Sequence, residues 1–554
     1  MLCATNIINK QRVGSNDKVF IFTTYFFILP TMIKWIFVSF LLSINIIEAQ
    51  TPTLLWSKFV GTSAVEYPDK ILAVPNGFLI LGRTETYDTL SCHLNENIIL
   101  IRTDTAGNPI WNSCYGGDSS DIPHDIIPTS DGNFLIVGST NSMEGDVTNN
   151  HFPGAAFGGW GTSDFWVIKI DTLGNKIWQS CYGGSGSEEG FCAVDLSDSY
   201  MIFGSTEDSN DGDVFGNHSP SSYDIWAIKI DTAGVLLWQK CIGGSSGDIL
   251  ESVVKISNDS IMLGANSYSN DGDATFSLGQ YDFWPVLIDS SANILTQNKL
   301  GGSWYENCHS IVKGINGGYV LTGSTSSNDI NVNGYHGSAD IWVVRTDDFG
   351  NFLGQSCLGG TGNEEAFKII SSRNNYYVVG YSASMDGDLS INKGYDDLWI
   401  VQLDSTGNIS WQQSYGGSLA DGAFDITMEN DSVIVVVGAS SSNDFDVTNN
   451  PGGDIWLLKF KLDFPTDVQE NNFKNSIVIS PNPSYGTVII YAPNNSISSK
   501  IIITDAFGKT IYFSENNKII NGIINLSLDV PSGVYLINCI IDGKAFLNKL
   551  IVQK

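Results

Sequence analysis

Short runs of alternating hydrophobic and polar residues, separated by clusters of Gly, Asn, Asp and Ser, fill the chain after residue 50. Runs such as HDIIPTS from His124 and NFLIVGST from Asn133 have the length and β-branched content of strands. No amphipathic helical pattern of 12 residues occurs in this region. The pattern predicts an all-β fold built from many short strands.

One strand pattern, Asp-x-Trp followed by apolar residues, recurs along the chain. A diverged copy without Trp, ENIILIRTD, ends at Asp104. The other six copies contain Trp166, Trp226, Trp284, Trp342, Trp399 and Trp456, at spacings of 60, 58, 58, 57 and 57 residues. This period fits a four-stranded propeller blade. Because the tryptophans hold fixed strand positions, we expect them in the core between blades and not on a sugar-binding surface.

A second recurring strand ends in Gly-Gly, as in IWQSCYGG from Ile177. Its first copy, LLWSKFVG from Leu54, precedes all Asp-x-Trp strands, and the last unit, with Trp456, lacks one. Seven complete units result only if the N-terminal strand joins the last blade, which removes two exposed sheet edges. We therefore predict a closed, seven-bladed β-propeller over residues 51–464. The alternative is an open β-solenoid, which would need capping repeats.

The turns between these two strands read D-x-x-G-N-x-x-W, as in DTAGNPIW from Asp104 and DTLGNKIW from Asp171. Gly-Asn supplies the positive φ that such hairpins require. The turn resembles the tryptophan-docking repeat of quinoprotein-type propellers, in which the Trp wedges between neighbouring blades. The match fails at Ala292 and Gly354, and it implies the fold but no quinone cofactor.

The N-terminal segment has the architecture of an export signal. From Met32 the sequence reads MIKWIFVSFLLSINIIEAQ, with a basic Lys34, an apolar stretch and Ala49 near a plausible cleavage point. We interpret residues 1–50 as a signal-peptide region with Met32 as the expected initiator, which leaves no transmembrane segment in the mature chain. The alternative is a membrane anchor between Val19 and Ile47.

Charge and cysteine content restrict the partners. The formal net charge is −31, so nucleic acid and acidic membranes are excluded as expected partners. None of the nine cysteines forms a CxxC pair, which argues against a zinc site. Four of them share one repeated position before Gly-Gly and are predicted to be buried thiols: Cys114, Cys181, Cys241 and Cys357. The alternative is a disulfide framework.

Acidic loops recur after the third strand of several units, as NDGDV, NDGDA and MDGDL. Closely spaced carboxylates with a Gly for the turn are what a calcium loop needs, although the full EF-hand pattern is absent. The candidate calcium ligands are Asp211, Asp213, Asp271, Asp273, Asp386 and Asp388. The alternative is a set of solvated loops whose Asp and Asn side chains cap turns.

The sequence provides no catalytic motif. HExxH is absent, and the adjacent carboxylates Glu188-Glu189 and Glu364-Glu365 point to opposite faces of a strand. We therefore expect a binding or scaffold module that recognises a glycan, a peptide or a surface protein. One alternative is an extracellular polysaccharide-active hydrolase or lyase, since propellers host such enzymes; another is a structural surface-layer component. A cluster of His, Tyr and carboxylates at the ring centre would favour the enzyme.

After residue 464 the Asp-x-Trp pattern ends, and a linker, 465–474, leads to four other motifs in residues 475–554. They read VISPNPSYGTVII, ITDAFGKTIY, INLSLDVPSGVYLINC and DGKAFLNKLIVQK. In this order they closely resemble the type A C-terminal sorting domain of type IX secretion cargo. The residues that carry the resemblance are Pro481, Asn482, Pro483, Gly486, Asp505, Gly508, Lys509, Gly533, Tyr535, Gly543, Lys544, Lys549 and Lys554.

The resemblance implies an Ig-like β-sandwich recognised by the outer-membrane translocon of Bacteroidetes-type bacteria. It also implies a sortase that removes the domain, and a cargo that reaches the cell surface or the medium by way of the periplasm. Alternating strands with hairpin glycines agree with this fold. The alternative is an adhesive Ig-like domain.

Overall fold

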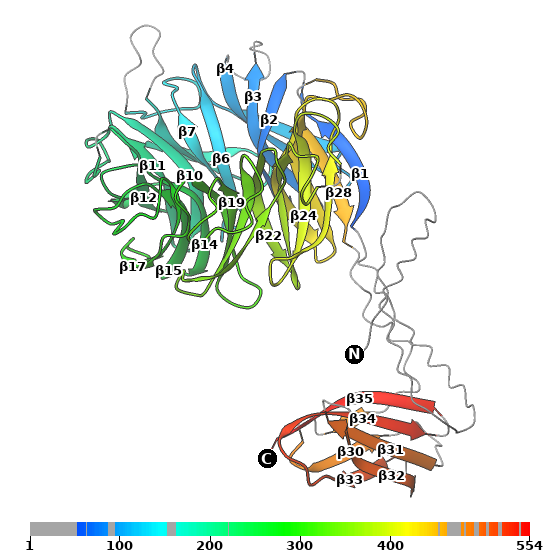
Figure 1. The fold of residues 1–554 in the computed structure, drawn as a ribbon. Helices are drawn as coiled ribbons and strands as arrows, with labels where there is room; N and C mark the ends of the chain where they lie inside the picture. Colours follow the sequence, from blue (N-terminus) through cyan, green and yellow to red (C-terminus); the bar gives the residue numbers. More distant parts are fainter. Residues whose placement is uncertain are drawn as a thin grey trace, which may run out of the picture. The chain divides into compact units, whose positions relative to one another are not determined.

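In the computed structural model, every element of the described chain is a β-strand (Figure 1). The structure describes residues 52–62, 64–86, 95–151, 162–219, 221–389, 391–452, 455–462, 478–480, 484–491, 498–505, 509–518, 523–541 and 544–553. The predicted signal-peptide region, 1–50, lies outside the described residues. The described part of the chain contains no helix with the length and hydrophobicity needed to span a bilayer.

Seven antiparallel four-stranded sheets form the blades. Blade 1 is β2 (Val65–Val74), β3 (Gly77–Thr86), β4 (Asn95–Thr103) and β5 (Pro109–Tyr115). Blade 2 is β6 (Asp121–Pro128), β7 (Phe134–Thr140), β8 (Asp164–Ile170) and β9 (Lys176–Tyr182). Blade 3 is β10 (Ser187–Asp195), β11 (Ser199–Glu207), β12 (Asp224–Asp231) and β13 (Leu236–Ile242). Blade 4 is β14 (Asp248–Ser257), β15 (Ser260–Ser267), β16 (Asp282–Asp289) and β17 (Ile294–Gln297).

The remaining blades follow the same order. Blade 5 is β18 (Glu306–Lys313), β19 (Tyr319–Thr325), β20 (Asp340–Thr346) and β21 (Phe352–Leu358). Blade 6 is β22 (Glu364–Ser372), β23 (Asn375–Ser382), β24 (Asp397–Asp404) and β25 (Ile409–Tyr415). Blade 7 combines β26 (Asp421–Asn430), β27 (Val433–Ser440) and β28 (Ile455–Lys461) with the N-terminal strand β1 (Thr53–Val60).

The N-terminal strand closes the ring, as predicted. β1 pairs antiparallel with β28, from Thr53 opposite Lys461 to Val60 opposite Ile455. The first strand of each blade is the inner one, and each contacts the inner strands of both neighbours, including β2 against β26. The seven-bladed propeller with four-stranded blades is therefore confirmed.

The repeated tryptophans fill the core between blades. Trp166, Trp226, Trp284, Trp342, Trp399 and Trp456 are all fully buried. Trp226 of blade 3 lies 4.6 Å from Phe165 of blade 2, measured between ring centroids. A buried aromatic pair of this kind contributes about 0.5–1.5 kcal/mol beyond its area. Their predicted place in the core is confirmed.

The tryptophans of the outer strands dock on hairpin glycines of the next blade. A methyl group added to Gly174 in blade 2 would come within 2.9 Å of the Trp111 ring in blade 1. Gly107 of blade 1 stands in the same relation to Trp56 of β1, at 2.8 Å. These hairpins require Gly for two reasons. A side chain would collide with the tryptophan ring, and φ is positive, at +82° for Gly174 and +77° for Gly107.

The cysteines follow the prediction at two of the four repeated positions. Cys181 and Cys241 are free and buried, and Cys357 is free but only partly buried. Cys114 was predicted to be a buried thiol and is instead disulfide-bonded and partly exposed. The repeat comparison misses this bond because it shows equivalent positions and not which other cysteine comes close.

Two further sheets form the C-terminal β-sandwich. One contains β29 (Val478–Ser480), β30 (Thr487–Tyr491) and β33 (Ile523–Ser527). The other contains β31 (Ser498–Asp505), β32 (Thr510–Lys518), β34 (Gly533–Ile541) and β35 (Lys544–Val552). Both sheets contribute to one core, with Val488 and Ile490 from the first and Ile503 and Ile537 from the second. The predicted fold of this segment is confirmed.

Candidate functional site

Each of the seven inner strands carries a β-bulge at the same place. The pairing with the second strand of the blade skips one residue, for example between Pro68 and Lys70 in blade 1. A bulge turns consecutive side chains toward the same side of a strand. The seven residues at the bulges are Asp69, His124, Phe191, Glu251, His309, Phe367 and Phe424.

All seven bulge residues line one cavity of about 210 Å³. The residues that follow the bulges complete its wall in four blades, as Lys70, Ser252, Lys368 and Asp425. We call these eleven residues the channel cluster. They come from all seven inner strands, so the cavity lies where those strands meet.

One side of the channel cluster is a hydrogen-bonded acid–base group. His309 Nε2 lies 2.8 Å from Glu365 Oε1, and His309 Nδ1 lies 3.9 Å from Glu251 Oε2. Tyr381 donates its hydroxyl proton to Glu365 Oε2 at 3.1 Å. Burial alone would lower the pKa of His309, but Glu251 and Glu365 raise it to about 9. His309 is therefore protonated at neutral pH.

The other side holds Lys70, Lys368, Asp69 and Asp425, with Asp125 beside Lys70. Lys70 forms an ion pair with Asp125 at 3.3 Å, and Asp425 accepts the backbone N–H of Ile71 at 2.9 Å. The charge of Lys70, together with burial, lowers the pKa of Lys368. Burial raises the pKa of Asp69 to about 7, so this carboxyl is half-protonated near neutral pH.

Aromatic rings separate these polar groups. Phe367 stacks on Phe424 with centroids 5.5 Å apart and lies 6.0 Å from Tyr381. His124 packs edge-on against Phe191 at 4.7 Å. Burial, with Arg83 and Lys70, lowers the pKa of His124 to about 4, so this imidazole is neutral.

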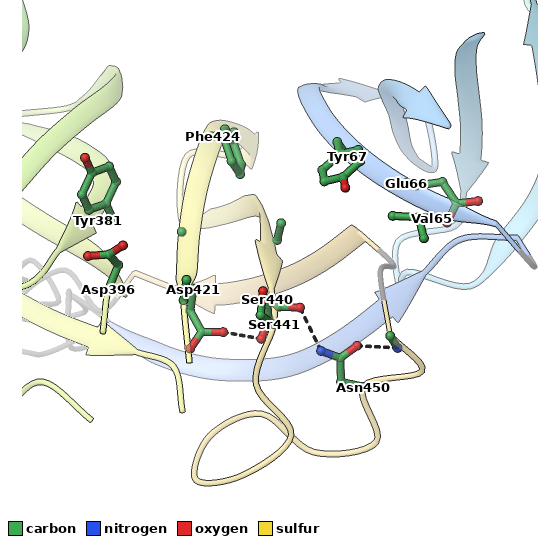
Figure 2. A pocket seen from close by; sticks show the side chains of 14 residues that line it. Val65, Glu66, Tyr67, Tyr381, Asp396, Asp421, Phe424, Ser440, Ser441 and Asn450 are labelled. Atoms are coloured by element: carbon green, nitrogen blue, oxygen red, sulfur yellow. Dashed lines mark hydrogen bonds between the residues drawn. The ribbon is translucent and has the colours of Figure 1, made fainter. Parts of the chain in front are cut away.

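A second cavity of about 390 Å³ lies between blades 6, 7 and 1 (Figure 2). Figure 2 shows Tyr67 and Phe424 above it, with Tyr381 and Asp396 from blade 6 at one side. Phe424 also lines the channel cavity, so the two cavities share a wall. This second cavity gives the channel cluster an aromatic rim at the start of the inner strands.

The predicted calcium ligands are engaged in holding the connections between blades. Asp211 Oδ1 accepts the backbone N–H of Ser185 at 2.7 Å, and Asp271 Oδ1 that of Ser245 at 2.7 Å. Asp386 Oδ1 does the same for Thr361 at 2.8 Å. Of the second aspartates, Asp273 and Asp388 accept the N–H groups of Gly243 and Gly359, at 3.4 and 3.1 Å, while Asp213 lies 3.5 Å from His151 Nε2.

These contacts account for the recurrence of the acidic loops without a metal. Among the described residues, no group of three or more His, Cys, Asp or Glu side chains is arranged to hold a metal ion. Calcium binding by the six aspartates stays a prediction.

A pair of buried carboxylates flanks the first Gly of five connections between blades. A methyl group added to Gly183 would lie 2.5 Å from Asp164 Oδ1 and 2.6 Å from Glu188 Oε2. Gly243, Gly301, Gly359 and Gly416 are enclosed in the same way. In the five Asp-x-Trp patterns whose aspartate the structure describes, its Oδ1 has no hydrogen-bond partner: Asp164, Asp224, Asp282, Asp340 and Asp397. Only Gly leaves room for both carboxylates.

Most of these aspartates lie beside one basic side chain, which comes from different positions in different blades. His151 lies 2.7 Å from Asp164, and His218 lies 2.7 Å from Asp224. Both histidines belong to the loop that precedes the Asp-x-Trp strand. In blade 4 that loop has Leu278 and no histidine. The basic side chain near Asp282 is instead Lys299, which follows the outer strand of the blade. Burial lowers the pKa of Lys299 to about 8, although Asp248 and Asp282 oppose this.

Because these carboxyl groups are buried, we expect the folding stability of the protein to fall as pH rises. Burial raises the pKa of both Asp121 and Glu188 to about 7, whereas in the unfolded chain they titrate near about 4. Their stabilising contribution is therefore complete below pH about 4 and is lost as pH rises through about 7. The stabilising contribution of protonated His309 is likewise lost as pH rises toward its pKa of about 9.

We expect the melting temperature to fall by roughly 3–6 °C between pH 5 and pH 8, measured by calorimetry at constant ionic strength. Glu188→Gln should flatten this slope, and the exposed Glu144→Gln should leave it unchanged. A melting temperature that rises over this range would contradict the assignment.

The described sorting residues occupy turns and strands of the sandwich. Asp505 and Lys509 close a hairpin, in which Asp505 Oδ1 accepts the backbone N–H of Lys509 at 2.9 Å. Gly486 has φ +104°, and Tyr535 donates its hydroxyl proton to the Pro531 carbonyl at 2.8 Å. Gly533 begins β34, Lys544 begins β35 and Lys549 lies within β35. Pro481, Asn482, Pro483, Gly508, Gly543 and Lys554 lie outside the described residues.

Sequence reasoning missed the channel cluster. It singled out Glu365 only as one of two adjacent carboxylates, and it left Asp69, Glu251 and His309 without a role. A signal existed, because the blades agree at the buried carboxylate that begins each inner strand and differ three residues later. Differences at one position of a repeat mark the place where the fold itself does not dictate the residue.

Comparison with known proteins places one segment in a family. Residues 478–553 match the secretion system C-terminal sorting domain, so the chain ends in a type IX sorting tail. No curated protein matches the chain. The sorting tail indicates export, with the cell surface or the medium as destination.

Solved structures resemble the propeller only in outline. The acylaminoacyl peptidase of Pyrococcus horikoshii is 10% identical, with a TM-score of 0.38, over 77% of this chain and 58% of the peptidase. A puromycin-hydrolyzing peptidase of Mycobacterium tuberculosis is 10% identical, with a TM-score of 0.37, over 70% and 51%. A subtype N10 neuraminidase-like protein of A/little yellow-shouldered bat/Guatemala is 9% identical, with a TM-score of 0.33, over 74% and 99%. These likenesses carry no argument about function.

Proposed function

We propose that this exported protein is a binding module whose propeller holds a polar ligand in the channel cluster. The supporting observation is that seven equivalent bulges present seven residues of four different kinds to one cavity. A repeat fold that needed these positions only for packing would fill them alike, as it does at the buried carboxylates.

The composition of the site favours one end of a glycan or a peptide as the ligand. The carboxylates Glu251 and Glu365 accept hydrogen bonds, and protonated His309 donates them. Phe367 and Phe424 offer a stacked apolar wall. Pockets with a few convergent polar groups among aromatic side chains are typical of ligand sites. The cavity of about 210 Å³ is suited to a single sugar ring or a single amino acid.

The test is calorimetric titration of the full-length protein with neutral and amino oligosaccharides and with short peptides. We expect Glu365→Gln to weaken a ligand at least tenfold, because it removes the negative charge beside His309 and leaves one acceptor oxygen for His309 and Tyr381 in place of two. Glu207→Gln, outside both the channel cluster and the hydrogen-bonded group of His309, Glu365 and Tyr381, is the matched control. A ligand bound equally by both variants would place the binding site elsewhere.

A specific observation also favours a hydrolase. Asp69 has a pKa of about 7, while the pKa of Glu365 is lowered because His309 outweighs the effect of burial. Two carboxyl groups with separated pKa values are what acid–base hydrolysis of a glycosidic bond uses. The oligosaccharides from this titration are also assayed for new reducing ends. Reducing ends that form with the natural protein and not with Asp69→Asn would identify the protein as an enzyme.

For the route of export, we propose cleavage of the signal in residues 1–50, passage through the periplasm, and recognition of residues 475–554 by the type IX translocon and sortase. The working module is then the propeller, 51–464, joined by the linker, 465–474. The sorting-tail match over 478–553 supports this division.

A further inference from the structure

Three exposed aromatic side chains and the half-buried Tyr281 lie in adjacent loops at the junction of blades 4 and 5, apart from the channel cluster. Tyr268 follows β15, Tyr281 precedes β16, and Trp304 and Tyr305 precede β18. The side chain of Trp304 is 60% exposed, that of Tyr305 47% and that of Tyr268 42%. We call these four residues the aromatic platform.

The platform is ordered by the backbone beneath it. Ring centroids are 5.6 Å apart from Tyr268 to Tyr281 and 6.3 Å from Tyr281 to Tyr305, with planes within 29° of parallel. The Tyr268 N–H donates to the Gly247 carbonyl at 2.8 Å, and the Trp304 N–H donates to Ser327 Oγ at 2.9 Å. A ligand would meet rings that are already in place, so little conformational entropy is lost on binding.

The fold does not require aromatic residues here. The backbone N–H at the Trp304 position makes the same hydrogen bond to a serine in blades 2, 4, 6 and 7, where the residue is Ser119, Ser246, Gly362 and Leu419. The Tyr305 position holds Ser120, Ser187, Gly247, Asn363 and Ala420 in blades 2, 3, 4, 6 and 7. Only blade 5 has aromatic residues at both positions. Its two rings are therefore best explained by a ligand.

The net charge of the protein restricts the kind of polymer that the aromatic platform can bind. Polymers that stack on a row of aromatic rings include single-stranded nucleic acids, acidic polysaccharides and uncharged polysaccharides. A formal net charge of −31 disfavours the two anionic classes. The phenolic hydroxyls of Tyr268, Tyr281 and Tyr305 make no hydrogen bond within the described part of the chain, so they are available to sugar hydroxyls.

We propose that the aromatic platform binds an uncharged polysaccharide chain. The C–H faces of successive sugar rings pack on Trp304 and the tyrosines, and the phenolic hydroxyls bond to the sugar hydroxyls. All inner strands run in the same direction, so the platform and the rim of the channel lie on the same face of the propeller. A chain held on the platform is thereby kept near the channel cluster.

The test is affinity electrophoresis and calorimetry of the full-length protein with soluble neutral glucan, xylan, mannan and galactan, and with acidic alginate and pectate. We expect at least one neutral polymer to bind and Trp304→Ala to weaken it tenfold or more. Tyr395→Ala removes a ring of 73% exposure from the loop of blade 6 and should change nothing. Near-ultraviolet circular dichroism checks that both variants are folded.

Three outcomes would overturn the proposal: binding only to the acidic polymers, binding to none of the polymers, or neutral-polymer binding that survives Trp304→Ala. Capture of a surface protein through Trp304 without any polysaccharide binding would likewise replace it with a protein interface. Glu365→Gln separates this site from the channel cluster, because neutral-polymer binding should persist in that variant. The two proposals can therefore fail independently.

Discussion

Removal of residues 467–554 is expected to leave a folded propeller that no longer reaches the cell surface. The seven sheets use strands from Thr53 to Lys461 only, so the truncation removes no blade strand. The family match over 478–553 assigns the lost segment to sorting. Fractionation of the native host, with an antibody to the propeller, should find the truncated protein in the periplasm and nearly none outside.

A smaller deletion tests whether the folded sandwich is what the exporter recognises. Deleting Lys549–Lys554 removes half of β35, including the fully buried Leu550 and Val552. It also removes the partner of Ser484, whose N–H donates to the Ile551 carbonyl at 2.8 Å. Loss of two such side chains costs on the order of 4–8 kcal/mol, enough to unfold a small domain.

The control for this deletion is Leu536→Ser, since Leu536 is exposed on β34 and its loss leaves the core intact. It should be exported as well as the natural chain. Truncated protein at the surface or in the medium at full yield would contradict the sorting assignment and favour an adhesive domain.

The second large effect is expected from deletion of Leu54–Gly61. Without β1, blade 7 keeps three strands and β28 becomes an exposed edge. Trp456 loses the Ser57 hydroxyl that accepts its indole N–H at 2.7 Å and the ring of Phe59 stacked 6.1 Å away. Gly107 of blade 1 loses the Trp56 ring that docks on it.

Because these losses fall at the junction that closes the ring, both neighbouring blades should open. We expect a fall of about 10 °C or more in the melting temperature, or failure to fold, from a loss on the order of 5 kcal/mol. Differential scanning calorimetry of the purified deletion measures this. An unchanged melting temperature would mean that the ring does not depend on β1.

A rearranged chain provides the matched control. Thr53 lies opposite Lys461, so a tight Asn-Gly turn can join the end of β28 directly to the start of β1. Moving residues 53–61 to this place within the full chain makes blade 7 continuous like the other six. This variant should recover the stability of the natural protein, which would show that the strand and not the chain order matters.

Much of the fold could be read from the sequence because each blade repeats the same local requirements. The buried Trp166 and its equivalents, the hairpin Gly174 that admits Trp111, and Gly183 between two carboxylates all recur at fixed spacing. The count of strands then required β1 to close the ring. The sorting tail was readable for a similar reason, since its motifs lie in order along one short segment.

The aromatic platform illustrates an intermediate case. Trp304 and Tyr305 stand out when the blades are compared, because the equivalent positions are small or polar. Their approach to Tyr268 and Tyr281 depends on the loop after β15 folding back over the connection to blade 5. Pattern alone could identify the unusual residues but not the row of rings that they form.

The residues of the channel cluster are brought together by the tertiary structure. Simple alternation along β2 would place Asp69 and Lys70 on opposite faces, but the bulge turns both into the cavity. Ring closure then brings Glu251, His309 and Glu365 together from three separate blades, and their mutual charges set the pKa of His309. A linear pattern records which residues repeat, whereas the chemistry of this site depends on which unlike residues the ring brings to one point.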